Sequence, residues 1–371
     1  MRSDFAFLFL GETLLIPHLY PVLAAVAELA PECRIDVWTS TSTSEALIGG
    51  WISELNAPLL RMRRAPGFRR IDDAEPGRNS ALPAKLPMLA RMLPALARTR
   101  VVVTAEQTSL WLPALLPLPS RFVNMLHGAG SMMNRADRRR RVPYKTLVAA
   151  ERERSALAAF GVPPDRIAVI GYAKAGFRHR TMARPQFAED RPIILYTPHW
   201  QKHRSSWWRW GPQVLEALLA SGRYNVIFAP HQRLSERAPE VRSIVARLAG
   251  RPDLHCDLDS FAMVDGSYTA AADIYLGDTS SQVVEFLMRP RPCLFLDAQG
   301  VDWEGDASYD MWKAGEVVTD IEQLLPSLAR AAGQQPRFHD AQLAFASESL
   351  GDTSGEVPCR AAREVIACLS R

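Results

Sequence analysis

Three histidines in this chain, His127, His199 and His231, each follow a short apolar run of the kind that forms a buried strand. In a parallel sheet the carboxyl ends of the strands meet at one edge, and ligands of open α/β folds bind beyond that edge. Imidazole titrates near neutral pH, so these side chains are candidates for proton transfer. For any one of these histidines a structural or capping role is the favoured interpretation, and it is the occurrence of three at the same topological position that indicates a site. Gly128 and Gly130, which follow the first of them, would let the backbone approach a ligand closely.

A Gly-Asp-Thr-Ser-Ser turn, at the junction of a predicted strand and a predicted helix, contains hydroxyl and carboxylate side chains. Its polar residues are Asp278, Thr279, Ser280 and Ser281. A hydroxyl at this position caps the helix, and the free N–H groups of the first helical turn attract a phosphate. Glu285, one turn later, could accept a hydrogen bond from a ribose hydroxyl. The turn therefore predicts a phosphate site, and a plain helix cap without a ligand is the alternative.

A basic and aromatic stretch follows the predicted strand 193–197. It would therefore form a loop at the edge of the sheet where ligands bind. Lys202 and Arg204 could neutralise a diphosphate, and the tryptophans at positions 207 and 210 could stack on a sugar or a base. The tryptophans are interpreted equally well as the start of a packing helix.

Strand-forming runs alternate with helical patterns along most of the chain, which is typical of parallel sheets built from βαβ units. The alternation occurs twice, on either side of a charged, proline-containing break at 178–191. We therefore predict an α/β protein with two doubly wound Rossmann-like domains facing a cleft, at 1–180 and 190–335. Helices at 336–371 would follow and could pack back across the domain boundary. The predicted strands are 5–10, 34–40, 101–104, 122–126, 166–170, 193–197, 225–229, 273–276, 293–296 and 317–319, and the clearest helices are 19–29, 340–350 and 357–369.

Composition excludes several classes of protein. The 371 residues are 47% hydrophobic and 23% charged, so the chain can bury a core and is not intrinsically disordered. A net charge of +4 is too weak to indicate nucleic acid as the main partner. The five cysteines are scattered, without a CxxC pair or a Cys/His cluster, which predicts a reducing compartment and no structural zinc. No apolar run approaches the ~20 residues that cross a bilayer, and we expect a cytoplasmic protein.

The motifs of several other enzyme classes are absent from the sequence. It contains no GxxxxGK(S/T) phosphate loop, no GxGxxG after the first predicted strand, no GxSxG elbow and no HExxH metal motif. Two doubly wound domains, with a phosphate turn in the second and a histidine at the inner edge of the first, fit a transferase that uses a nucleotide-activated donor. We expect neither a metal nor another cofactor.

The order of these motifs resembles that of the CDP-glycerol glycerophosphotransferase family, which includes the teichoic-acid polymerases. The resemblance spans about residues 120–320 and rests on the Asp-x-Ser-Ser turn, the Arg-Pro step after it, the His-Gly pair and a Gly-Tyr-x-Lys step. Three motifs depart from the family. The His-Gly pair lacks the Thr-Pro-Leu-Lys that follows it there, residue 173 is alanine where the family has proline, and His199 stands where it has threonine. The matching positions are 127–128, 171–174, 195–200, 229–231, 273–281 and 289–296.

The resemblance implies a GT-B architecture in which the first domain binds the acceptor and the second binds the nucleotide donor. It implies that His127 is the base for the acceptor hydroxyl and that His231 contacts the donor diphosphate. Ser280 and Ser281 would hold phosphate, and Asp278 would orient the turn. The other donor-side candidates are Thr279, Glu285, His199, Lys202 and Arg204, and the acceptor-side candidates are Gly128, Gly130 and Lys174.

These inferences predict a metal-independent transferase that moves glycerol phosphate, or a sugar, from a nucleotide-diphosphate donor to a hydroxyl acceptor. CDP-glycerol is the expected donor, and a cell-envelope or surface polysaccharide, such as a lipid-linked glycan, is the expected acceptor. A nucleotide-sugar glycosyltransferase on the same fold is the first alternative. A sugar-nucleotide epimerase and a non-catalytic nucleotide-binding domain are the others.

Two arginine-rich stretches lie in the first half of the chain, at 61–70 and 138–141. The simpler interpretation is solvated loop charge. The alternative is a surface for anionic lipid, because clustered arginines attract phosphate near a membrane. On that interpretation the protein would bind peripherally to the inner face of the cytoplasmic membrane.

Overall fold

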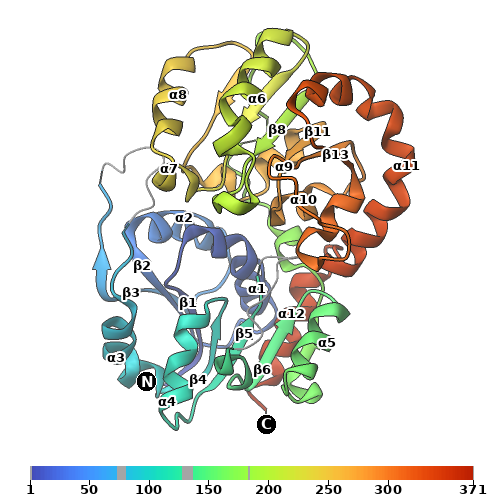
Figure 1. Ribbon diagram of the computed structural model, residues 1–371. Coiled ribbons are helices and arrows are strands. Elements are labelled where there is room, and N and C mark those ends of the chain that lie inside the picture. Colours follow the sequence, from blue (N-terminus) through green and yellow to red (C-terminus); the bar gives the residue numbers. More distant parts are fainter. Residues whose placement is uncertain (1, 73–80, 128–136, 183, 371) are drawn as a thin grey trace.

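The computed structural model describes residues 2–72, 81–127, 137–182 and 184–370. Two parallel β-sheets, one in each half of the chain, are each covered by helices on both faces (Figure 1). The sheets belong to two domains that face each other, the first at the lower end of the view and the second at the upper end. The predicted fold class, two doubly wound domains in a GT-B-like arrangement, is confirmed.

The first sheet has seven strands in the order β3-β2-β1-β4-β5-β6-β7. The chain starts near the centre of the sheet and winds outward to one edge and then to the other, which is the doubly wound topology. The strands are β1 (Ser3–Phe9), β2 (Ile35–Thr41), β3 (Leu60–Arg69), β4 (Thr99–Thr104), β5 (Arg121–Met125), β6 (Lys145–Val148) and β7 (Ile167–Val169).

The second sheet has six strands in the order β10-β9-β8-β11-β12-β13 and repeats this winding. All of its strand pairs are parallel, so their carboxyl ends lie at one edge. The strands are β8 (Ile193–Thr197), β9 (Asn225–Phe228), β10 (Leu254–Cys256), β11 (Ile274–Gly277), β12 (Cys293–Leu296) and β13 (Glu316–Val318).

Helices connect successive strands and cover the sheets. None of those in the described ranges combines the length and the apolar character that crossing a membrane requires. The α-helices are α1 (Ile16–Leu29), α2 (Ser42–Ile52), α3 (Lys85–Leu96), α4 (Trp111–Leu115), α5 (Glu151–Ala159), α6 (Trp207–Ser221), α7 (Leu234–Arg237), α8 (Glu240–Leu248), α9 (Ser267–Ala271), α10 (Ser281–Phe286), α11 (Leu324–Leu350) and α12 (Val357–Ala367).

The central strands are apolar at nearly every position because both faces of each sheet are buried. In β1, Phe5, Phe7 and Phe9 belong to the cluster that includes α1, while Ala6 and Leu8 belong to the cluster that includes α3. This division follows from the two-residue period of a strand. The same apolar runs are what made the strands recognisable in the sequence.

Every predicted strand is present within two residues of its predicted bounds, and three strands, β3, β6 and β10, were not predicted. β3 contains most of the first arginine-rich stretch, so the interpretation of that stretch as a loop is wrong. It is an edge strand, where charged side chains oppose pairing with another sheet and where Pro66 removes no hydrogen bond from a central ladder. Its alternating arginines therefore reflect a strand with one exposed edge.

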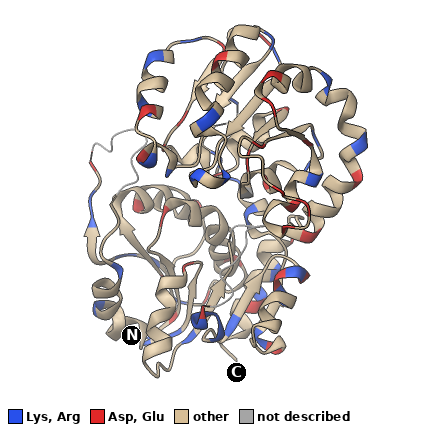
Figure 2. Cartoon of the chain, viewed as in Figure 1, with Lys and Arg blue, Asp and Glu red and all other residues tan. Residues whose placement is uncertain are grey.

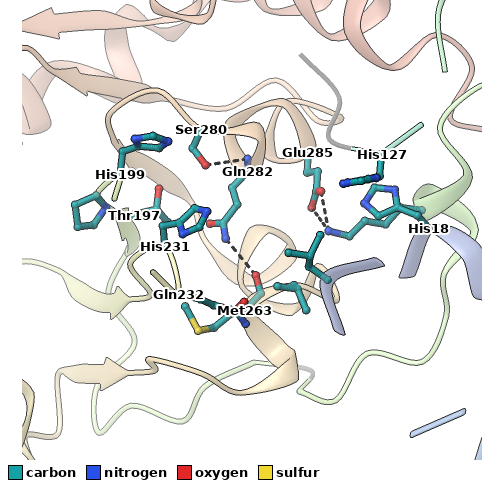
Figure 3. A pocket seen from close by; sticks show the side chains of 14 residues that line it. His18, His127, Thr197, His199, His231, Gln232, Met263, Ser280, Gln282 and Glu285 are labelled. Carbon is teal, nitrogen blue, oxygen red and sulfur yellow. Dashed lines mark hydrogen bonds and ion pairs between the residues drawn. The ribbon is translucent and has the colours of Figure 1, made fainter. Parts of the chain in front are cut away.

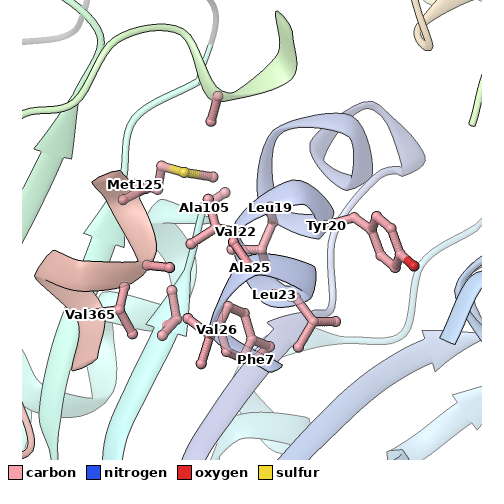
Figure 4. Close-up of a cluster of buried hydrophobic side chains, with 14 of the residues drawn as sticks. Phe7, Leu19, Tyr20, Val22, Leu23, Ala25, Val26, Ala105, Met125 and Val365 are labelled. Carbon is pink, nitrogen blue, oxygen red and sulfur yellow. The ribbon is translucent and has the colours of Figure 1, made fainter. Parts of the chain in front are cut away.

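The chain returns to the first domain at its carboxyl end. α11 is 27 residues long and contains both residue 335 and residue 336, so the predicted domain boundary falls inside one continuous helix. α12 packs against α1, and Val365 shares a cluster with Val22 and Val26 (Figure 4). This contact ties both ends of the chain to the first domain.

Gly171 lets the segment that leaves the first sheet pass close to the joint between α11 and α12. Its φ of +93° is one that L side chains rarely adopt, and a Cβ there would meet the carbonyl oxygen of Asp352. The next residue, Tyr172, donates its backbone N–H to that oxygen at 2.7 Å. This close approach fixes the position of Tyr172 and of Lys174 shortly after it.

Candidate active site between the two domains

A cavity of about 110 Å³ lies between the domains, at the carboxyl edges of both sheets. Its wall combines four imidazoles, a capping hydroxyl and a buried ion pair (Figure 3). The polar lining residues that matter below are His18, His127, Lys174, His199, His231, Ser280 and Glu285.

The strand order explains why side chains so far apart in the sequence meet here. β9, β8 and β11 are neighbours in the second sheet, and His231, His199 and Ser280 follow them in that order. Because the strands are parallel, these three residues lie at one edge. From the first domain, His127 follows β5 and His18 lies in the first turn of α1. The cavity thus collects the three predicted histidines and the predicted serine, and adds a fourth imidazole.

The imidazoles of His199 and His231 each accept a backbone hydrogen bond at Nδ1. The donors are the N–H groups of Gln201, at 3.2 Å, and of Arg233, at 3.1 Å. An accepting Nδ1 carries no proton, so the proton of each neutral ring is on Nε2. Burial, with smaller effects of nearby basic side chains, lowers the pKa of His199 to about 4 and of His231 to about 3. Near pH 7 both rings are neutral Nε2–H donors, with centres 5.9 Å apart.

The lowered pKa of His231 makes stability depend on pH. Unfolding returns this imidazole to a pKa of about 6.5, so the unfolded chain binds the additional proton and stability is lost as the pH falls from about 7 towards 3. Between about pH 7 and 5 this group accounts for a loss of at most about 2 kcal/mol. We expect His231→Gln to lose less stability than the unmodified protein over that interval, as measured by urea unfolding at both pH values. Equal losses in the two proteins would contradict the burial of a neutral ring.

His127 lies on the first-domain side of the cavity. Its side chain is open to the cavity, yet the protein around it lowers its pKa by desolvation, and a hydrogen bond with the backbone of Ala105 acts in the opposite direction. A backbone bond that raises the pKa of an imidazole is one in which a ring N–H donates to a carbonyl, and it leaves a lone pair on the other nitrogen. That nitrogen can accept a proton. Gly128 and Gly130, which follow, lie outside the described residues.

His18 is a site residue that the sequence analysis missed. It is only 6% exposed, and its ring lies 6.1 Å from that of His127 and edge-on to that of Tyr172 at 5.5 Å. Burial, with the nearby Lys174 and His127, lowers its pKa well below the usual value, so the ring is neutral. The available signal was its place after the first strand, but a 3-10 turn (Thr13–Leu15) separates it from the strand end.

Asp278 lies behind the cavity wall and does not line the cavity. Its side chain is fully buried, and Oδ2 accepts the backbone N–H groups of His199 at 2.8 Å and of Ser206 at 3.1 Å. Burial raises its pKa to about 7, against the effect of these hydrogen bonds. Through its two hydrogen bonds to backbone N–H groups, the carboxyl group holds the loop that carries His199. Thr279 is also buried and is not among the lining residues.

Ser280 is both the N-cap of α10 and part of the cavity wall. Its backbone is extended, and its Oγ accepts the backbone N–H of Gln282 at 3.2 Å. The Gln282 side chain donates to the carbonyl of Met263 at 3.2 Å, which holds the next loop against α10. Ser281 is the first residue of the helix. The turn thus has the capped geometry that the sequence predicts.

Glu285 takes part in a buried ion pair that was not predicted. Lys174 Nζ lies 2.7 Å from each carboxylate oxygen, and the Tyr172 hydroxyl donates to Oε1 at 2.6 Å. Both side chains of the pair are only 9% exposed. The pair joins α10 of the second domain to a 3-10 turn, η5 (Ala173–Gly176), that follows the first sheet. The carboxylate predicted to bind a ribose is thus already engaged, and Lys174 lines the cavity as its partner.

The basic and aromatic stretch after β8 does not line the cavity. Lys202 and Arg204 lie in the short helix η6 (Lys202–Arg204), and the Arg204 guanidinium is 5.5 Å from the centre of the Tyr309 ring. Trp207 is buried and stacks on Phe228 at 5.4 Å. The interpretation of Trp207 as the start of a packing helix is therefore the one that the structure supports.

Two parallel doubly wound domains whose carboxyl edges face one shared cavity define a protein of the GT-B-like class. Solved structures of this architecture cover essentially the whole chain at low identity. The wall teichoic acid polymerase TagF has a TM-score of 0.67 at 14% identity and is matched over 99% of this chain and 89% of its own. The motif-based resemblance to the teichoic-acid polymerases is thus confirmed at the level of fold.

Two other similar structures extend the comparison. A putative UDP-N-acetylglucosamine 2-epimerase from Listeria monocytogenes has a TM-score of 0.63 at 15% identity, over 100% of this chain and 96% of its own. HepE from Anabaena, in complex with UDP and glucose, has a TM-score of 0.54 at 13% identity over 100% of both chains. No protein-family model and no curated protein sequence matches this chain.

Metal binding has no support in the described part of the chain, where no three His, Cys, Asp or Glu side chains are grouped so as to hold an ion. Among the residues that the structure describes, His199 and His231 approach each other without a third such ligand. The expectation of a metal-independent reaction stays a prediction.

Proposed function

We propose that this protein is a GT-B-type transferase that moves a group from a nucleotide-diphosphate donor to a hydroxyl acceptor. The observation that carries the proposal is the shared cavity, in which His127 of the first domain faces His199, His231 and Ser280 of the second (Figure 3). A proton acceptor on one side and neutral N–H donors on the other suit a reaction between a hydroxyl and an activated phosphate.

CDP-glycerol is the donor that we propose, with glycerol phosphate as the transferred group. The order of the motifs supports this choice, as does the similarity to TagF, a variant of which was soaked with CDPG. HepE, solved with UDP and glucose, shows that a nucleotide and a sugar can share this architecture. The proposed acceptor is a hydroxyl of a cell-envelope or surface polysaccharide.

In the proposed reaction the acceptor hydroxyl attacks the phosphorus that carries the glycerol. The hydroxyl proton passes to the ring nitrogen of His127 that is not bonded to Ala105, a new P–O bond forms, and the bond to the CMP oxygen breaks so that CMP leaves. The Nε2–H groups of His199 and His231 donate to phosphate oxygens as negative charge moves towards CMP. Asp278 contributes by holding the His199 loop in place.

The direct test is a panel of CDP-, UDP-, GDP- and CMP-linked donors, each incubated with and without a hydroxyl acceptor, with released nucleotide as the readout. Acceptor-dependent release of CMP from CDP-glycerol supports the proposal. Release of another nucleotide would identify a glycosyltransferase. An isomerised donor without any acceptor would identify an epimerase, the activity named for two similar structures. Nucleotide binding without turnover of any donor would identify a non-catalytic nucleotide-binding domain.

Removal of the Ser280 hydroxyl is expected to weaken donor binding. A hydrogen bond to a charged group contributes about 1.5–3 kcal/mol, so the CDP affinity of Ser280→Ala should fall about 10- to 100-fold in calorimetry. Loss of the cap also costs about 1 kcal/mol of stability. Ser280→Thr keeps a hydroxyl and a cap and is the matched control. If Ser280→Ala binds CDP as tightly as Ser280→Thr, the serine is a structural cap only.

A further inference from the structure

A second pocket lies on the second domain, between α11 and the chain that enters β13. It encloses about 470 Å³ and shares no lining residue with the cavity between the domains. In Figure 1, α11 runs along the outer side of the second domain, on the side of β13. The lining residues used below are Trp303, Trp312, Glu316, Arg330, Gln334 and Phe338. We call this the α11 pocket.

Aromatic rings from both walls line the α11 pocket. Trp303, in the connection from β12 to β13, is partly buried, and its ring packs edge-on against that of Trp312 at 5.8 Å. Phe338, on α11, is also partly buried. Each partly exposed ring offers an apolar face on which a flat, weakly polar ligand can stack.

Trp312 provides an independent indication of a ligand. It lies in η8 (Ala307–Ala314), which packs against α11, and it is only 2% exposed. Its Nε1–H is buried and has no acceptor among the residues that the structure describes. A buried donor without a partner costs free energy, and a ligand oxygen that enters beside this ring would remove that cost.

The polar side chains of the α11 pocket form a connected array of donors and acceptors. Glu316 pairs with Arg330 and accepts the hydroxyl of Ser327 at 2.7 Å. The Gln334 amide joins both, since its nitrogen donates to Glu316 at 3.0 Å and its oxygen accepts from Arg330 at 3.3 Å. Figure 2 shows both blue and red segments along α11, so this side of the domain is not uniformly basic.

The charges in the α11 pocket are largely compensated. Arg330 is paired with Glu316, and Lys313 lies 2.9 Å from Asp310. Arg337 is the lining cation for which the described ranges contain no ion pair, and its guanidinium lies 5.8 Å from the centre of the Phe338 ring. A phosphate or another small anion would meet the Glu316 carboxylate, so the pocket favours an uncharged ligand.

We propose that the α11 pocket binds a segment of a carbohydrate chain built from neutral sugar rings. A sugar hydroxyl both donates and accepts, as the array of Glu316, Arg330 and Gln334 requires. The apolar face of a sugar ring stacks on Trp303 or Phe338, and a hydroxyl oxygen accepts the Nε1–H of Trp312. The site lies outside the cavity between the domains and needs no nucleotide, so it is independent of the transfer reaction proposed above.

A glycan array tests the α11 pocket without any assay of transfer. Labelled protein is applied to an array of neutral and anionic bacterial surface glycans at about 50 and about 500 mM salt, with no donor present. Glycans that are bound are then titrated by calorimetry. The pocket variants are Trp303→Ala and Gln334→Ala, and Trp303→Phe keeps a ring. The matched control is Trp208→Ala, which removes a partly buried tryptophan of the same domain that does not line the pocket.

We expect binding of neutral glycans at both salt concentrations, about 10-fold weaker in Trp303→Ala and about 2- to 10-fold weaker in Gln334→Ala. Trp303→Phe should retain most of the affinity, and Trp208→Ala all of it. Thermal unfolding confirms that each variant is folded, and Gln334, on the surface of α11, can be replaced without opening the core.

Three results would overturn the proposal. The first is an array on which no neutral glycan is bound, or on which only anionic glycans are bound and salt abolishes the binding. The second is a Trp303→Ala variant that binds like Trp208→Ala, since the glycan would then lie elsewhere, as in the cavity between the domains. The third is a dimer in sedimentation velocity that Trp303→Ala dissociates, which would show that a second copy of the chain covers the pocket.

Discussion

Replacement of His127 by alanine is expected to lower the rate of transfer by about 10²–10⁴-fold while CDP affinity changes little. A hydrogen bond with the backbone of Ala105 raises the pKa of this imidazole, as a donating ring N–H does, so the role that we propose for the other ring nitrogen is to accept the acceptor's proton. The donor contacts come from His199, His231 and Ser280 across the cavity, and the substitution leaves them in place. The turnover rate with CDP-glycerol and the affinity for CDP by calorimetry are the two measurements.

The pH dependence distinguishes a base from a positioning role. Because desolvation lowers the pKa of His127, the neutral, proton-accepting form persists below pH 6.5, and activity is lost only as the pH falls through the lowered value. The acid limb of kcat/KM should therefore lie below about pH 6.5. His127→Gln keeps much of the side-chain volume, and His339→Gln, at an exposed position of α11, controls for histidine loss elsewhere. Near-normal turnover in both His127 variants would remove this residue from the mechanism.

The second large effect concerns the buried ion pair. Glu285→Gln is expected to destabilise the protein by about 3–5 kcal/mol, because it leaves the Lys174 ammonium buried without a counter-charge. Lys174→Met should cost a similar amount, since it removes the counter-charge of the buried Glu285 carboxylate, which keeps its hydrogen bond from the Tyr172 hydroxyl. The double variant buries no unpaired charge and should lose much less than the sum of the single variants. Urea unfolding of all four proteins gives the coupling free energy.

An exposed pair in the same chain provides the control for this cycle. Lys313 Nζ lies 2.9 Å from Asp310 Oδ1, but its side chain is 58% exposed. Solvent screening reduces such a pair to about 0–1 kcal/mol, so Lys313→Met should have little effect on stability. If Glu285→Gln costs no more than Lys313→Met, the buried pair does not join the two domains.

The strands that could be predicted most accurately from the sequence were the fully buried ones. β8 and β12 have the predicted bounds because every residue in them is buried, and an uninterrupted apolar run is visible in the sequence. β3 was missed because it lies at a sheet edge, where arginines alternate with partly buried residues. The length of α11 was also underestimated, because the predicted helix 340–350 covers only its last part and the helix continues through Pro336.

The site residues that could be predicted from the sequence were those placed directly after a predicted strand. A histidine or serine placed directly after a strand reaches the carboxyl edge by topology, and His127, His199, His231 and Ser280 all line the cavity. Lys202 and Arg204 also follow a strand closely in sequence, but they lie in a short helix and do not line the cavity. No pattern in the sequence indicates which of such neighbours faces the cavity.

The sequence by itself determined the strand-to-helix turn at Ser280, because a helix cap involves only residues two or three apart and needs no distant partner. It also determined the two alternating halves, since apolar periodicity is local. Only the tertiary structure decided that Glu285 binds Lys174, 111 residues away, and that four imidazoles share one cavity. Those contacts and the lowered pKa values arise because the two domains pack against each other. Burial between two domains depends on both of them, so no single segment of the sequence specifies it.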